Sequence, residues 1–170
     1  VVEGNVIMKK GRGRFQQIRG ALKLKERGRV YAEKVIGDIE LTGDAETILS
    51  VDEVDGDVDN KSGVVAPGES PGITTIDGDY TQDSSGVLAI EIAGLDGSVP
   101  EFDQLIVTGE MLVSGTLRIT LLDGYVPTIG DEFQIFQFGT YAGTFTNFEF
   151  PDIDGITFDA RGLSTTCLLY

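Results

Sequence analysis

A short glycine-centred pattern recurs along the chain and constrains its fold more than any other sequence feature. The pattern is apolar–x–Gly–x–apolar, and the gaps between its central glycines are 16, 17, 19, 22 and 31 residues. Short repeats at near-constant spacing are typical of solenoids, in which each repeat forms one turn of chain stacked on the next. The six central glycines are Gly4, Gly20, Gly37, Gly56, Gly78 and Gly109.

Hydrophobic alternation predicts strands and no helix. A period of two residues, which is typical of half-buried strands, runs through residues 87–94, 105–112, 115–122 and 131–138. Residues 20–36 tolerate a helix by composition, but their apolar positions also alternate. We therefore expect an all-β chain with β-solenoid coils over residues 1–122. A β-sandwich with glycine-marked turns is the alternative, and the steady spacing favours the solenoid.

The last third of the chain is rich in phenylalanine. Seven of the nine Phe residues lie between Phe133 and Phe158. The end of a solenoid exposes its core and an unpaired strand edge, so it needs a cap. We expect residues 123–170 to form an aromatic-rich β cap continuous with the solenoid, although a plain Phe-rich β core would bury much the same residues.

Acidic residues occupy the positions between the glycine and the apolar residues of the pattern. If the glycine and its apolar neighbours share the inner face of a strand, these positions face solvent. Asp55, Asp57 and Asp59 would then share an outer face, and a divalent cation could relieve their repulsion. These three residues are candidate ligands for a structural Ca²⁺ ion, and we expect no other cofactor. The solvent-facing acids are Asp38, Asp55, Asp57, Asp77, Asp79 and Glu110.

The segment Gly68-Glu69-Ser70-Pro71-Gly72 has the G-x-S-x-G form of a nucleophile elbow. The chain contains no His to serve as the base, and Pro71 has no N–H for an oxyanion hole. An alternating, β-branched stretch follows in place of a helix. We interpret Ser70 as part of a structural turn and expect no catalytic residues and no enzymatic activity.

Charge is distributed unevenly along the chain. Residues 1–34 contain ten Lys and Arg against three Glu, a net charge of +7, and the remainder carries −22. In a solenoid, sequence order becomes spatial order, so a positive end would meet a negative end of another subunit. Such heterologous contacts propagate into filaments when they do not close. The basic block has only Phe15 and Tyr31 as aromatics, so nucleic-acid binding is not expected.

Four motifs occur in an order that resembles the autotransporter-associated β-strand repeats. They are Pro67 to Gly72, Gly78 to Tyr80, Asp103 to Gly109 and Gly115 to Leu117, and the resemblance covers about residues 54–151. The resemblance implies a right-handed parallel β-helix or solenoid, export from a bacterium and a role at the cell surface. It implies no catalytic residues.

The expected function is an extracellular structural or adhesive module at a bacterial cell surface or matrix, with head-to-tail self-association as one form. Its partners would be copies of itself, other surface proteins or polysaccharide. A polysaccharide-binding or polysaccharide-cleaving β-helix is the alternative. No run of 18 apolar residues is present, so no membrane span is expected.

Overall fold

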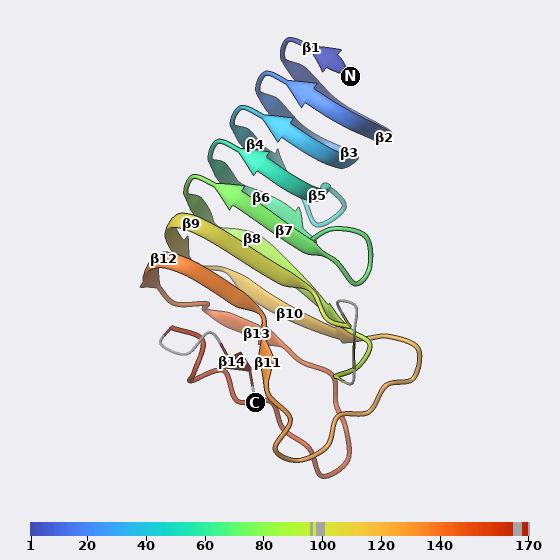
Figure 1. Ribbon diagram of the computed structural model, residues 1–170, viewed down its shortest axis with the longest axis vertical. Coiled ribbons are helices and arrows are strands. Elements are labelled where there is room, and N and C mark those ends of the chain that lie inside the picture. Colours follow the sequence, from blue (N-terminus) through green and yellow to red (C-terminus); the bar gives the residue numbers. More distant parts are fainter. Residues whose placement is uncertain (96, 98–100, 165–167, 170) are drawn as a thin grey trace.

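The computed structural model describes residues 1–95, 97, 101–164 and 168–169, and these residues form strands and turns with no helix (Figure 1). The all-β prediction is therefore confirmed for this part of the chain. The strands are β1 (Val2–Glu3), β2 (Val6–Arg19), β3 (Leu22–Ile36), β4 (Ile39–Gly43), β5 (Ile48–Asp55), β6 (Val58–Val65), β7 (Ile73–Asp77), β8 (Tyr80–Ile92), β9 (Gln104–Val113), β10 (Thr116–Leu121), β11 (Phe133–Gln134), β12 (Phe136–Gly143), β13 (Asn147–Glu149) and β14 (Leu168–Leu169).

Strands from successive repeats pair in parallel, one above the next (Figure 1). The residue two positions after each central glycine pairs with the equivalent residue of the next repeat. These paired residues are 16, 17, 19, 22 and 31 positions apart, the same separations as the glycines themselves. Stacked side by side, they form a column. The sequence repeat is thus the repeat of strand pairing, and we call the chain between one central glycine and the next a pass. This column contains Val6, Leu22, Ile39, Val58, Tyr80 and Met111.

The six glycines line up from pass to pass, at corners between strands. Gly56 lies between the end of β5 and the start of β6, with a φ of 148°. A Cβ on Gly56 would lie 2.8 Å from the backbone carbon and oxygen of Gly37, the glycine of the preceding pass. Gly20, Gly37, Gly78 and Gly109 each meet the preceding glycine in the same way.

The structure corrects one expectation about these glycines. We expected them inside strands on the inner face, but all except Gly109 lie outside the strands, and none is fully buried. The apolar residues that flank each glycine do point inward, as Val54 and Val58 show by being 0% and 1% exposed. The physical reason is that the chain turns sharply at the glycine, where two passes approach too closely for a side chain.

The core consists of inward-facing columns that run from pass to pass. One column contains Val35, Val54, Ile76 and Val107, and all four are buried. A second column changes from Leu41 to the buried polar residues Asn60 and Gln82. Tyr80 donates a hydrogen bond to Gln82 Oε1 at 2.8 Å, and Gln82 Nε2 donates to the Ser114 carbonyl at 2.7 Å. Gln82 is therefore tied to the backbone that surrounds it.

The parallel sheet continues beyond residue 122. Strand β12 pairs with β9 and β13 pairs with β10, both in parallel, so part of the predicted cap forms a further pass. The predicted aromatic cluster is present around it. Phe133 and Phe136 are buried, and neighbouring rings contact one another from Phe145 through Phe148 and Phe150 to Phe158. The antiparallel pair β11–β14 forms a separate two-stranded sheet.

Additional pairings of β3 with β5 and of β6 with β8 close the path of hydrogen-bonded strands on itself. Each long strand thus contributes to more than one part of the sheet that surrounds the core. Parallel pairing and stacking of passes are established by these registers, and the right-handed solenoid winding stays a prediction. The described residues include no helix long and apolar enough to cross a bilayer.

Candidate functional site

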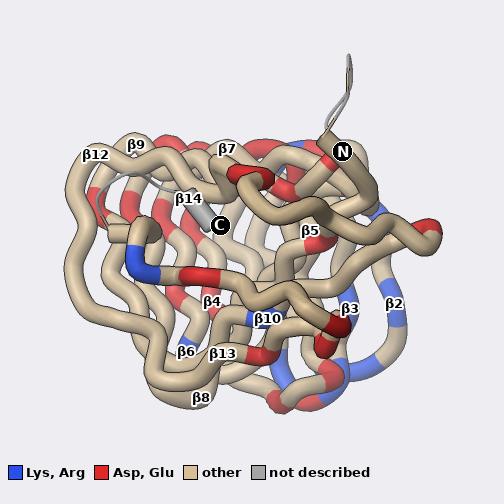
Figure 2. The backbone as a smooth tube through the Cα atoms, turned by 90° about the horizontal axis from the view of Figure 1, so that it is seen from below, with Lys and Arg blue, Asp and Glu red and all other residues tan. Residues whose placement is uncertain are grey.

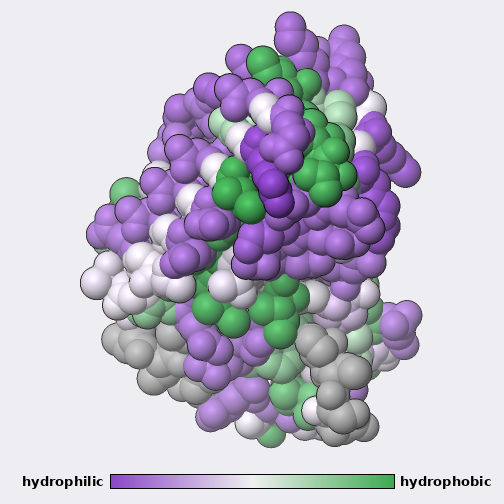
Figure 3. Space-filling view, turned by 45° about the horizontal axis from the view of Figure 1, so that its top comes forward, coloured by the Kyte–Doolittle hydropathy of each residue, from purple (hydrophilic) through white to green (hydrophobic). Residues whose placement is uncertain are grey.

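Basic residues gather in β2 and β3 (Figure 2), the strands at the N-terminal end of the stack, and most of them are exposed. Ten of the thirteen Lys and Arg residues lie in residues 1–34. Figure 3, in which this end comes forward, shows a mostly hydrophilic surface with separate hydrophobic patches. The most distinctive charged feature of the molecule is therefore at one end of the stack.

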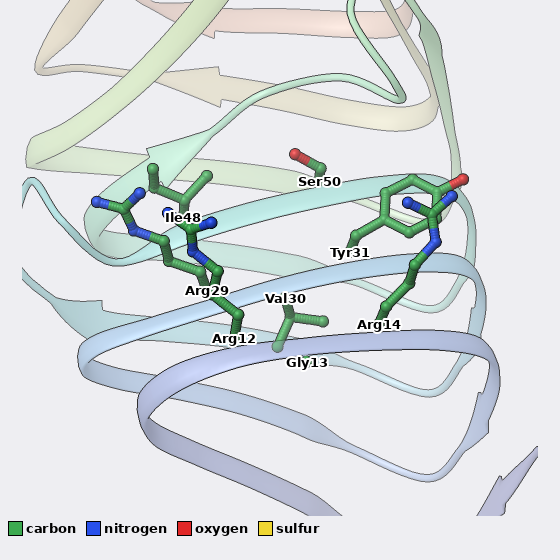
Figure 4. Close-up of a pocket in the computed structure, with 8 residues that line it drawn as sticks. All are labelled: Arg12, Gly13, Arg14, Arg29, Val30, Tyr31, Ile48 and Ser50. Carbon is green, nitrogen blue, oxygen red and sulfur yellow. The ribbon is translucent and has the colours of Figure 1, made fainter.

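A hollow of about 330 Å³ lies within this basic surface (Figure 4). Strand register creates it, because side chains point outward in two columns separated by an inward column. The first outward column stacks Arg12, Arg29 and Ile48, and the second stacks Arg14, Tyr31 and Ser50. Gly13 and Val30 also line the hollow, from the inward column between the two.

The second column is held in place by several contacts. The guanidinium carbon of Arg14 lies 4.2 Å from the centroid of the Tyr31 ring, a cation–π geometry, and Arg14 Nη1 lies 2.6 Å from Glu69 Oε1. The Tyr31 hydroxyl donates to Asp52 Oδ2 at 2.9 Å. Burial, together with this bond, raises the pKa of Tyr31 to about 12. These contacts therefore orient the Tyr31 ring and compensate the charge of Arg14.

The first column is less compensated. Arg29 Nε donates to the Glu46 carbonyl at 3.3 Å, and no carboxylate of the described residues forms an ion pair with Arg29. Arg12, its direct cross-strand partner, has neither an ion pair nor a side-chain hydrogen bond in the described part of the chain. The two guanidinium groups point the same way along one side of the hollow (Figure 4).

Sequence reasoning did not find this hollow, because the basic block was considered only for its net charge and its few aromatic residues. The usable signal was the spacing of Gly11 and Gly28, which lie 17 residues apart and are paired. The same spacing sets Arg12 against Arg29 and Arg14 against Tyr31.

Acidic residues line the corner that the glycines form. All six acids predicted to face solvent are exposed. Three of them bridge successive passes. Asp38 Oδ1 accepts the backbone N–H of Asp57 at 3.1 Å. Asp57 Oδ1 accepts the backbone N–H of Asp79 at 2.9 Å, and Asp79 Oδ1 accepts the backbone N–H of Glu110 at 2.7 Å. Asn5 Oδ1 accepts the N–H of Ala21 in the same way. Each carboxylate thus satisfies a backbone donor at the next corner.

The three residues predicted to bind Ca²⁺ do not share one strand. Asp55 ends β5, Asp57 is at the corner, and Asp59 lies in β6 with its carboxylate 3.1 Å from Lys61 Nζ. Within the described residues, no group of three or more Asp, Glu, Cys or His side chains could hold a metal ion. The geometry thus adds nothing to the Ca²⁺ hypothesis, which stays a prediction.

The Gly68–Gly72 segment forms a turn between β6 and β7, and Ser70 is exposed there. A strand follows it, as the alternation indicated. Asp103, which is 1% exposed, accepts the Gly72 N–H at 2.7 Å and the Glu91 N–H at 2.9 Å. Burial raises the pKa of Asp103 to about 7, against the opposite effect of these two bonds. Asp103 therefore fastens the turn to the end of β8.

Comparison of the chain with protein-family models, with curated proteins and with solved structures found no match. The resemblance to the autotransporter-associated β-strand repeats therefore stays a prediction. Functional inference depends on the geometry and charge of this chain.

Proposed function

We propose that this chain is a right-handed parallel β-solenoid module with a structural or adhesive role at a bacterial cell surface or matrix, and that copies of it associate head to tail. The right hand is that of nearly all crossover connections between parallel strands. The proposal includes no catalytic activity, since the chain has no His and Pro71 lacks the N–H that an oxyanion hole needs.

The observation that carries this proposal is the separation of charge along the stacking direction. Passes are stacked in sequence order, so the +7 of residues 1–34 belongs to one end and the −22 of the remainder to the rest of the stack. Complementary charge favours encounter and sets orientation. In the described residues, one edge of β2 pairs with β3. On the other edge, only the last two residues of β2, Ile18 and Arg19, are paired, and their partner is β1. The remaining backbone groups could join a second chain.

Sedimentation velocity across a range of protein and salt concentrations, with electron microscopy of the same samples, tests head-to-tail association. We expect the sedimentation coefficient to rise with concentration at low salt. It should return to the monomer value near about 1 M salt, where the screening length is about 3 Å. A monomer at every concentration in low salt would refute self-association, and would mean that the Lys residues of β2 keep its edge unpaired.

A charge reversal in β2 sharpens this test. The double variant Lys9→Glu, Lys10→Glu should remain monomeric, whereas Lys9→Arg, Lys10→Arg should behave as the wild type because its charge is unchanged. Both positions are exposed, so neither variant disturbs the core. Release of reducing ends from polysaccharides by the purified protein would contradict the non-catalytic part of the proposal.

A further inference from the structure

Several cations on the outer faces of this protein pair with a carboxylate on the neighbouring strand. Lys23 pairs with Glu40, Lys34 with Glu53 and Arg118 with Glu149, and each pair joins neighbouring strands. Two pairs of cations lie directly opposite each other on β2 and β3. Lys10 and Arg27 each have a carboxylate within 4 Å, whereas Arg12 and Arg29 have none among the described residues. Like charges in this position destabilise a sheet.

An anion seated beside these two arginines would offset their repulsion. Neither arginine has a carboxylate partner in the described residues, and both line one side of the 330 Å³ hollow. Guanidinium groups bind planar oxyanions through paired hydrogen bonds. The hollow is open to solvent, and Ser50 adds a hydroxyl on its opposite side that makes no hydrogen bond in the described part of the chain.

The opposite wall indicates which anionic polymer fits. Arg14 covers one face of the Tyr31 ring and is itself paired with Glu69, so that face is not free to stack on a nucleobase. The two cations, the free hydroxyl and the covered face of the Tyr31 ring favour a hydroxyl-rich ligand that carries carboxylate or sulfate groups.

We propose that the hollow between Arg12, Arg29 and Ser50 binds the carboxylate or sulfate groups of an acidic polysaccharide. This inference rests on the adhesive part of the proposed function and does not depend on head-to-tail association. Arg12 and Arg29 hold the oxyanion, Ser50 donates to or accepts from a sugar hydroxyl, and the Arg14–Tyr31 wall keeps the hollow open.

Titration calorimetry with polygalacturonate, heparin and neutral dextran at about 0.15 M salt tests this binding under moderate screening. The wild type should bind one or both acidic polymers and not dextran. Free galacturonate and inorganic sulfate, titrated separately, distinguish a carboxylate from a sulfate preference. Binding of neither polymer, or equal binding of dextran, would overturn the proposal.

Substitution at Arg12 separates a defined site from general attraction to a basic surface. Arg12→Gln should weaken polymer binding about tenfold or more, which corresponds to about 1.4 kcal/mol. Lys9→Gln removes an exposed charge outside the hollow and should change binding less than about twofold, as expected for a single exposed charge. Arg12→Lys should be intermediate, because the charge remains and the paired hydrogen bonds are lost.

Equal losses for Arg12→Gln and Lys9→Gln would contradict a defined site, as would tighter binding of single-stranded DNA than of either polymer. Arg12 has no partner in the described residues and lies opposite another cation, so Arg12→Gln should keep or slightly raise the wild-type melting temperature. Sedimentation of each sample identifies monomers, and monomers that bind polymer would support this inference even if head-to-tail association fails.

Discussion

Single residues at the corners decide how closely the passes of this protein approach. At Gly56 the backbone has a positive φ and packs against the preceding glycine, so a side chain would meet both torsional strain and a backbone contact. The following Asp57 uses its short carboxylate to accept the N–H of Asp79 in the next pass. A Gly-Asp pair at a corner therefore combines close approach with satisfaction of a backbone donor.

The Gly56→Ala variant tests this role. We expect the free energy of unfolding to fall by about 1–3 kcal/mol, since the new Cβ would force the two passes apart. Gly124→Ala is the matched control, because Gly124 also has a positive φ, 74°, but nothing lies within 4 Å of the position that a Cβ would take there. Urea unfolding of both variants measures the difference, and an equal or smaller loss for Gly56→Ala would contradict a role of close packing.

Elements in this fold are joined by register and by a few polar contacts, some at the surface and some buried. Glu40 of β4 accepts hydrogen bonds from Lys23 of β3 and Lys61 of β6, which together hold its pKa at about 2. Asp103 performs a similar task in the interior, where it joins the turn before β7, the end of β8 and the start of β9. Loops between strands are thereby fixed to the sheet.

The Asp103 contact predicts a pH dependence of stability. The pKa of Asp103 is raised in the folded protein, to about 7, so ionisation opposes folding. The stabilisation that protonated Asp103 contributes to folding should be complete below pH about 4 and lost as pH rises toward 7. Urea unfolding at several pH values should show wild-type stability falling over this range more steeply than that of Asp103→Asn, which does not titrate.

The Asp103→Asn variant should also be less stable than the wild type at pH 5, by about 1–3 kcal/mol, because its amide nitrogen would face a backbone N–H donor. Asp123→Asn, at an exposed turn, is the control for removal of one negative charge. Parallel pH profiles for wild type and Asp103→Asn would show that Asp103 ionises with an ordinary pKa in the folded protein.

At the scale of the whole molecule, charge sets how the stack interacts. The net charge is −15, yet residues 1–34 are strongly basic. Acids recur along the corner from pass to pass, while Arg12 and Arg29 lie opposite each other on β2 and β3, near the N-terminal end. A stack with such unlike regions is suited to interactions that depend on orientation.

The Ca²⁺ hypothesis predicts an effect on the stability of the entire stack. If Asp55, Asp57 and Asp59 bind Ca²⁺ in the folded state only, added calcium should raise the melting temperature by a few degrees, and EDTA should reverse the change. Sodium chloride at matched ionic strength controls for screening. A melting temperature that responds to neither calcium nor EDTA would exclude a structural calcium site.

Much of the architecture could be predicted from the sequence because one residue type is physically required at each corner. The glycine spacing predicted the strand register, and the alternation around Val54 and Val58 predicted the inner face. Seven clustered Phe residues predicted the aromatic cluster near the C-terminal end. These features depend on local sterics and on periodic burial, both of which are encoded in neighbouring residues.

Which outer side chains meet was decided only by the tertiary structure. Between Met8 and Lys10 the register shifts from 16 to 17 residues, and Glu26 in the partner strand has a positive φ of 58°. Without that shift Arg12 would lie opposite Gly28, and the paired guanidinium groups would not form. Glycine spacing sets the distance from corner to corner, but a single extra residue within a strand determines which side chains are neighbours.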